Sequence, residues 1–124
     1  MPAVVNVLII EEEPLLALDI ESVLADHGSV QVTHYRSAAD ASGVAGLQGF
    51  RLAVVEARLG AAETVALTER LVRAGVATVV MSADRKSLEL FPHATPLEKP
   101  FDAQRLLAAC DAARARRPGA PHLS

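Results

Sequence analysis

The sequence of 124 residues is poor in aromatic side chains and has a single cysteine. It contains no Trp, one Tyr and three Phe, although 51% of its residues are apolar. A hydrophobic core with so few aromatic residues must be built from aliphatic side chains, which suits helices packed on a sheet of Val, Ile and Leu. The lone Cys110 excludes an intrachain disulfide, and its helical spacing with Leu106 and Ala113 predicts a small buried thiol.

Long apolar runs and a basic excess are also missing. No stretch approaches the roughly 20 apolar residues that a membrane-spanning helix needs. Fifteen acidic against twelve basic residues give a formal net charge of -3, whereas nucleic-acid-binding domains usually carry a basic excess or stripe. The four histidines are scattered, without the spacing of a metal site. We therefore expect a cytoplasmic protein that binds neither nucleic acid nor membrane.

Short apolar runs alternate with helical patterns along the chain. The expected strands are residues 4–10, 30–35, 52–55, 76–81 and 94–97. Helical spacing or start signals follow each of them, although residues 83–93 support no more than a short turn. This alternation predicts a single domain over residues 1–117, a doubly wound α/β sandwich with a parallel sheet. Residues 118–124 are expected to form a disordered tail.

Local signals mark the expected helix starts. Pro14 suits the first turn of a helix, where its missing N–H costs nothing. Ser37, with Asp40 three residues later, resembles a capping box that opens a short helix ending near Gly46 or Gly49. Asp102 is placed to cap the last helix.

Charged residues stand at the ends of three expected strands. Glu11–Glu13 follow the first strand, Glu56 follows the third and Lys99 follows the fifth. Right-handed crossovers bring the carboxyl ends of parallel strands to one edge, where such folds bind ligands. Several carboxylates and one lysine suit a divalent cation or a phosphoryl group. The acidic turn would repel a bare phosphate, so nucleotide or flavin binding is not expected.

Four segments around these residues resemble the receiver domain of bacterial two-component response regulators. They are residues 7–14 (VLIIEEEP), 54–60 (VVEARLG), 79–83 (VVMSA) and 98–101 (EKPF). Each is weak alone, but they occur in the right order. The resemblance implies a flavodoxin-like (βα)5 sandwich with a five-stranded parallel sheet in the order 2-1-3-4-5. It also implies phosphorelay signalling, with a histidine kinase or a downstream signalling protein as partner and no enzymatic activity.

The same resemblance implies a metal and phosphoacceptor site. Glu11 and Glu12 stand where receivers keep an acidic pair that holds Mg²⁺, with Glu12 at the direct-ligand position. Glu56 stands at the phosphoacceptor aspartate, and the backbone carbonyl of Arg58 at the third protein ligand.

The resemblance also implies switch residues. Ser82 stands at the hydroxyl residue that hydrogen-bonds the phosphoryl group, and Lys99 at the lysine that contacts its oxygens. The peptide bond from Lys99 to Pro100 is expected to be cis, as receivers usually have. Receivers commonly carry an aromatic residue three positions before this lysine, but here Pro96 takes its place and cannot rotate as a tyrosine does.

The glutamate at the phosphoacceptor position is the main departure from the receiver pattern. One extra methylene moves the carboxylate by about 1.5 Å, whereas in-line phosphoryl transfer needs a tighter placement. Glu12 is also longer than an aspartate, so Mg²⁺ binding is expected to be weak or absent. Glu11, Glu12 and Glu56 outnumber Lys99, and we expect Lys99 to reach Glu56 instead, with help from Arg58 or Arg85. These features predict a pseudo-receiver.

Two alternatives remain open at this stage. The first is a receiver that binds Mg²⁺ and is phosphorylated on Glu56 or another carboxylate. The second is a small ligand-binding or enzymatic α/β domain that uses the acidic edge and Ser82, although no base is placed beside Ser82 by motif. By analogy with receivers, the partner surface would include Leu88, Leu90, Phe91 and Arg105.

Overall fold

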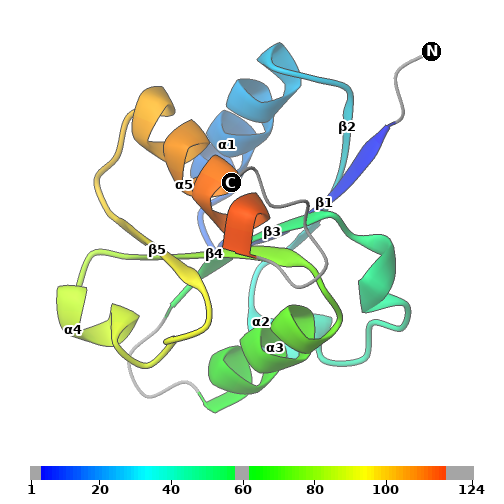
Figure 1. The fold of residues 1–124 in the computed structure, drawn as a ribbon, viewed down its shortest axis with the longest axis vertical. Coiled ribbons are helices and arrows are strands. Elements are labelled where there is room, and N and C mark those ends of the chain that lie inside the picture. The colour runs from blue at the N-terminus through cyan, green and yellow to red at the C-terminus, as the bar shows by residue number, and fades with distance from the viewer. Residues whose placement is uncertain (1–3, 58–61, 117–124) are drawn as a thin grey trace.

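The structure of the chain is a computed structural model that describes residues 4–57 and 62–116. Five parallel strands form one sheet in the order β2-β1-β3-β4-β5 (Figure 1). Their bounds are β1 (Val5–Ile10), β2 (Val30–Tyr35), β3 (Leu52–Glu56), β4 (Ala77–Ser82) and β5 (Thr95–Glu98). This is the predicted doubly wound order, and the fold prediction is confirmed. The tail expected at residues 118–124 lies outside the described residues.

Helices cover both faces of the sheet. They are α1 (Pro14–Asp26), α2 (Ala38–Ala41), α3 (Ala62–Arg73), α4 (Arg85–Leu88) and α5 (Ala103–Arg116). Figure 1 shows α1 and α5 together on one face, with α2 and α3 on the opposite face. Within the described ranges, no helix combines the length and the apolar character needed to cross a membrane.

Three of the helices, α1, α2 and α5, begin where the sequence predicted. Pro14 is the first residue of α1. The Oγ of Ser37 accepts a hydrogen bond of 3.1 Å from the backbone N–H of Asp40 at the start of α2. The Oδ1 of Asp102 accepts one of 2.8 Å from the N–H of Arg105 at the start of α5. Capping side chains satisfy backbone donors that have no partner within the helix.

The second helix is shorter than the sequence predicted. It ends at Ala41 instead of near Gly46 or Gly49. Gly43 and Gly46 disfavour a continued helix, and Gly46 takes a left-handed φ of 72° before a separate 3₁₀ turn at Leu47–Gly49. The fourth helix is the short turn that was expected.

Two aliphatic cores hold the helices on the sheet. Ile9 of β1 points toward the core under α1 and α5, and its neighbour Leu8 points toward the core under α2 and α3, as alternating strand side chains must. Cys110 is fully buried in the first core, and burial raises the pKa of its thiol to about 11. Phe91, predicted to lie on the partner surface, is instead buried in the second core. That part of the prediction is wrong, because a large aromatic side chain gains more by filling the aliphatic core.

Candidate functional site

Four predicted site residues lie at the carboxyl edge of the sheet. Glu11 directly follows β1, Glu56 and Ser82 are the last residues of β3 and β4, and Lys99 directly follows β5. The parallel register aligns these ends, and the backbone N–H of Lys99 donates a hydrogen bond of 2.9 Å to the carbonyl of Ser82. The peptide bond between Lys99 and Pro100 is cis, as predicted.

The ammonium group of Lys99 joins two carboxylates from different strands. Its Nζ lies 2.9 Å from Oε1 of Glu11 and 3.2 Å from Oε1 of Glu56. The other oxygen of Glu11 accepts a hydrogen bond of 2.9 Å from the backbone N–H of Glu13. The side chains of Glu11, Lys99 and Glu56 are 1%, 18% and 21% exposed. These ion pairs are therefore largely withdrawn from water. In such a setting charges interact more strongly than they do at an exposed surface.

The pKa values of the two carboxyl groups shift in opposite directions. Burial would raise the pKa of Glu11, but hydrogen bonds from Glu13 and with Glu56, together with Lys99, lower it overall. Burial and the neighbouring Glu11 carboxylate raise the pKa of Glu56 by more than Lys99 lowers it. Burial would lower the pKa of Lys99, but Glu11 and Glu56 raise it overall. Glu11 is thus the carboxylate that balances the charge of Lys99, and Glu56 holds a proton more tightly than a free glutamate.

The predicted acidic pair is divided between two places. Glu11 points into the site, whereas Glu12 is exposed and lines a separate cavity with Arg36, Ser37 and Asp40. Adjacent residues after a strand can point to different sides, which the sequence motif does not reveal. Arg58, whose carbonyl was predicted as a third metal ligand, lies outside the described residues.

The described side chains do not form a ready magnesium site. Mg²⁺ requires near-ideal octahedral coordination by oxygen atoms. The carboxylates are suitable donors in kind, but an ammonium group lies where Glu11 and Glu56 converge. Among the residues that the structure describes, no three Asp, Glu, His or Cys side chains are grouped so that they could hold a metal ion. The residues as arranged therefore fit a lysine-bridged pair better than a bound cation.

Ser82 is buried at the end of β4 and has a local partner. Its Oγ accepts a hydrogen bond of 3.0 Å from the backbone N–H of Asp84. Asp84 in turn caps α4 by accepting hydrogen bonds from the N–H of Lys86 and the hydroxyl of Ser87, at 3.0 and 3.1 Å. The hydroxyl of Ser82 is thus coupled to the start of α4, and its contact with a phosphoryl group stays a prediction.

The predicted helper Arg85 does not join the carboxylate pair. Its Nε lies 2.9 Å from Oε2 of Glu98, in an exposed ion pair on the outer side of β5. The prediction that Arg85 assists Lys99 is therefore wrong, because the Arg85 guanidinium pairs with the Glu98 carboxylate instead. Pro96 lies exposed on the same strand.

His34 is a contact that the sequence reading did not assign to the site. Its Nε2 lies 2.7 Å from the backbone carbonyl of Glu11, and the N–H of Glu11 donates to the carbonyl of Tyr35 at 3.0 Å. Both contacts come from the edge strand β2 and fix the backbone that carries the Glu11 side chain. The parallel register of β1 with β2 sets Ile10 opposite Tyr35, so a signal existed once the strand order was known.

The cavity beside Glu56 is small. Its volume is about 100 Å³, and its lining includes Ile10, Arg36, Glu63 and Thr64. Binding pockets for organic ligands usually measure about 300–1,000 Å³. This cavity is too small for a nucleotide or flavin, in agreement with the acidic turn that follows β1.

Solved structures of receiver domains share this fold. A response regulator receiver protein from Sinorhizobium medicae is 26% identical, with a TM-score of 0.72 over 92% of this chain and 98% of that chain. A CheY-like receiver domain from Methylobacillus flagellatus is 23% identical, with a TM-score of 0.67 over 90% of this chain and 99% of that one. A putative pilus assembly protein from Burkholderia thailandensis is 21% identical, with a TM-score of 0.69 over 88% and 97% of the two chains. No protein-family model and no curated protein matches the sequence.

Proposed function

We propose that this protein is a receiver domain of two-component signalling that acts through protein contacts without ordinary phosphorylation, with Glu56 at the phosphoacceptor position. The chain has the receiver fold, which supports a role in two-component signalling. The observation that carries the finer proposal is the bridge from Lys99 to both Glu11 and Glu56. That bridge occupies the place where a phosphoryl group would be received.

The electrostatics of the pair oppose phosphoryl transfer. A carboxylate attacks phosphorus only when it is ionised, and the pKa of Glu56 is raised by burial and by Glu11. The Glu11 carboxylate, held charged by Glu13 and Lys99, would repel an approaching phosphodonor at close range. The additional methylene of Glu56 also displaces its oxygens by about 1.5 Å relative to an aspartate. These effects act in the same direction.

Weak or absent Mg²⁺ binding belongs to the same proposal. A cation could bind between Glu11 and Glu56 only if the Lys99 ammonium moved away, which would break two ion pairs of 2.9 and 3.2 Å. The same lysine neutralises part of the charge that would attract a cation. A receiver with this site needs no metal to balance the Glu11 charge.

We also propose that the chain is not an enzyme. Ser82 accepts a hydrogen bond from a backbone N–H and Cys110 is buried with a raised pKa. The ring of His34 contacts a backbone carbonyl. None of these three contacts forms the nucleophile–base pair that covalent catalysis uses.

Intact-mass measurement after incubation with acetyl phosphate and Mg²⁺ tests the proposal. The wild type should gain no phosphoryl group. The Glu56→Asp variant has the shorter acceptor of ordinary receivers, and a phosphoryl adduct on it would identify the extra methylene of Glu56 as the barrier. A stable phosphoryl adduct on Glu56 of the wild type would overturn the proposal and favour a phosphorylatable, Mg²⁺-dependent receiver. Tight Mg²⁺ binding by the wild type in a calorimetric titration would favour the same alternative.

A further inference from the structure

The outer side of the edge strand β2 carries unpaired backbone groups. In a parallel strand, every second residue directs its N–H and C=O groups to the same side. The carbonyls of Ser29 and Tyr35 accept hydrogen bonds of 2.9 and 3.0 Å from N–H groups at the start of β1 and just after its end. The odd-numbered residues of β2 therefore face β1. Val30, Val32 and His34 direct their backbone groups away from the sheet.

The opposite edge of the sheet, β5, is protected against pairing. This strand has four residues, and the N–H of Lys99 donates to the carbonyl of Ser82 in β4, so Pro96 and Glu98 face outward. Pro96 has no N–H to offer, and the charged Glu98 is paired with Arg85 at 2.9 Å. Short length, proline and charge are means by which proteins prevent edge strands from pairing with other chains.

β2 lacks these protections. Its six residues, Val30–Tyr35, contain no Pro, Asp, Glu, Lys or Arg. Val30 and Val32 pack against the core under α1 and α5, which holds the strand flat on the sheet. Among the residues that the structure describes, only β1 pairs with β2. The outer side of β2 is therefore a ready template for another strand.

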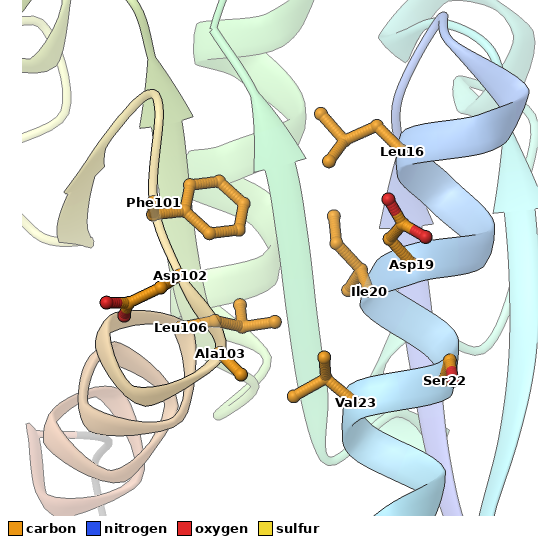
Figure 2. A pocket seen from close by; sticks show the side chains of 9 residues that line it. All are labelled: Leu16, Asp19, Ile20, Ser22, Val23, Phe101, Asp102, Ala103 and Leu106. Carbon is orange, nitrogen blue, oxygen red and sulfur yellow. The ribbon is translucent and has the colours of Figure 1, made fainter.

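The neighbouring helix α1 does not cover this edge. Figure 2 shows Ile20 and Val23 of α1 directed toward Leu106 of α5. These side chains meet between the two helices, over the face of the sheet. The backbone groups on the outer side of β2 thus stay accessible.

We propose that β2 pairs with β2 of a second copy of the chain, antiparallel and centred on Val32, so that two five-stranded sheets become one continuous sheet. A two-fold axis perpendicular to the sheet keeps the matching faces of both copies on the same side. Val32 then lies opposite Val32 of the second copy, Val30 opposite His34, and Gln31 opposite Thr33. All the outward N–H and C=O groups of β2 fall in hydrogen-bonded pairs in this register.

Charge complementarity favours a second copy as the occupant. No like charges oppose one another within the paired strands, because β2 carries no acidic or basic residue besides His34. The same register sets Arg36 opposite Gly28 of the second copy, two residues from Asp26 at the end of α1. Arg36 and Asp26 are both exposed, so a base approaches an acid at each end of the pair.

Pairing of this kind also closes on itself. An isologous contact uses the open edge of both copies, and the edges that remain are the protected β5 strands. The assembly should therefore stop at a dimer. The inference goes beyond the proposed function and does not depend on whether Glu56 is phosphorylated.

Sedimentation analysis of the full chain over a range of concentrations is the first test. Two paired strands bury little surface, so we expect a dimer that forms at micromolar or higher concentration and dissociates on dilution. Amide hydrogen exchange followed by NMR then identifies the edge. The amides of Val30, Val32 and His34 should exchange quickly in the dilute monomer and slowly in the dimer. Those of Gln31 and Thr33, which face β1, should be protected in both.

Substitutions at the two-fold axis test the register. Val32→Lys opposes two ammonium groups and Val32→Glu opposes two carboxylates, so each variant alone should dimerise about tenfold or more weakly than the wild type. A mixture of the two variants should dimerise again, because Lys then faces Glu. Val72→Lys is the matched control at another half-buried valine, on α3, and should dimerise as the wild type does. Circular dichroism melting establishes that the variants are folded.

Four outcomes would overturn the inference. They are a monomer at every concentration, a dimer whose outward β2 amides stay unprotected, a dimer that Val32→Lys leaves unchanged, and a mixture of the two charged variants that stays monomeric. Species that grow beyond a dimer would also contradict isologous pairing. The exchange measurement needs no variant, so it decides the question even if a substitution unfolds the chain.

Discussion

Two regions meet at the start of α1, the charged edge of the sheet and the exposed leucines of α1, Leu15 and Leu18. At the edge, the Nζ of Lys99 forms ion pairs with the carboxylates of Glu11 and Glu56, at 2.9 and 3.2 Å. On α1, Leu15 and Leu18 remain exposed to water. The contrast is between a charged site that the protein's own lysine occupies and apolar side chains that the described residues leave exposed. Substitutions at the edge should therefore change stability strongly, whereas substitutions of the exposed leucines should change it little.

Removing the lysine should have the largest effect on stability. In the Lys99→Ala variant, Glu11 and Glu56 remain close and poorly solvated without their cation, so the free energy of unfolding should fall by about 3 kcal/mol. Urea unfolding at neutral pH measures this loss. The only other lysine, Lys86, is exposed, and Lys86→Ala should change stability by less than about 0.5 kcal/mol. Equal losses in the two variants would show that the bridge is not stabilising.

The two carboxylates should contribute unequally. Glu11 is the more buried and has a partner for each oxygen, so Glu11→Gln should cost about 2 kcal/mol in urea unfolding. Glu56 holds its proton more tightly than a free glutamate, so the neutral Glu56→Gln should cost less than about 1 kcal/mol. The reverse order would mean that Glu56, not Glu11, carries the charge that balances Lys99.

The pH dependence of stability should separate the same two groups. The pKa of Glu11 is lowered from 4.5, so its stabilisation is present above pH 4.5 and is lost as the pH falls through the lower folded value. The pKa of Glu56 is raised from 4.5, so the folded state is penalised as the pH rises from 4.5 through that higher value. The stability of Glu56→Gln relative to the wild type should therefore improve as the pH rises above 4.5. A relative stability that falls over this range would contradict the raised pKa.

The smallest effect on stability is expected at the exposed leucines of α1. Leu18 is exposed, so Leu18→Lys should change the free energy of unfolding by no more than about 0.5 kcal/mol in either direction. Thermal unfolding of this variant beside Leu90→Lys measures the difference. A large loss would mean that Leu18 contributes to the fold of the isolated chain, and the contrast between the two regions would then fail.

Sequence patterns predicted the fold well because the local signals agreed with one another. The β-branched run ending at Ile10, the proline at position 14 and the cap at Asp102 each specify one end of an element. The predicted length of α2 was wrong, because a capping box fixes where a helix starts and says little about where it ends. The sequence also failed to predict that Phe91 is buried, since only the packed structure shows which side of a short turn faces the core.

The sequence predicted which residues make up the candidate site better than it predicted how their side chains are oriented. Strand ends placed Glu11, Glu56 and Lys99 at one edge, because parallel strands align their carboxyl ends. The sequence could not tell that Glu11 is buried against Lys99 while Glu12 is exposed, since that depends on the backbone direction after β1. The contact from His34 to the Glu11 carbonyl becomes predictable only when the register of β1 with β2 is known as well as the strand order.

The most direct test of the account observes the ammonium group of Lys99 itself. With only two lysines in the chain, its side-chain ¹⁵N signal can be assigned by comparison with Lys99→Ala. We predict a slowly exchanging ammonium signal that changes on Glu11→Gln and on Glu56→Gln, and that stays in place when millimolar Mg²⁺ is added. A freely exchanging signal, or one that Mg²⁺ releases, would contradict a site closed by its own lysine.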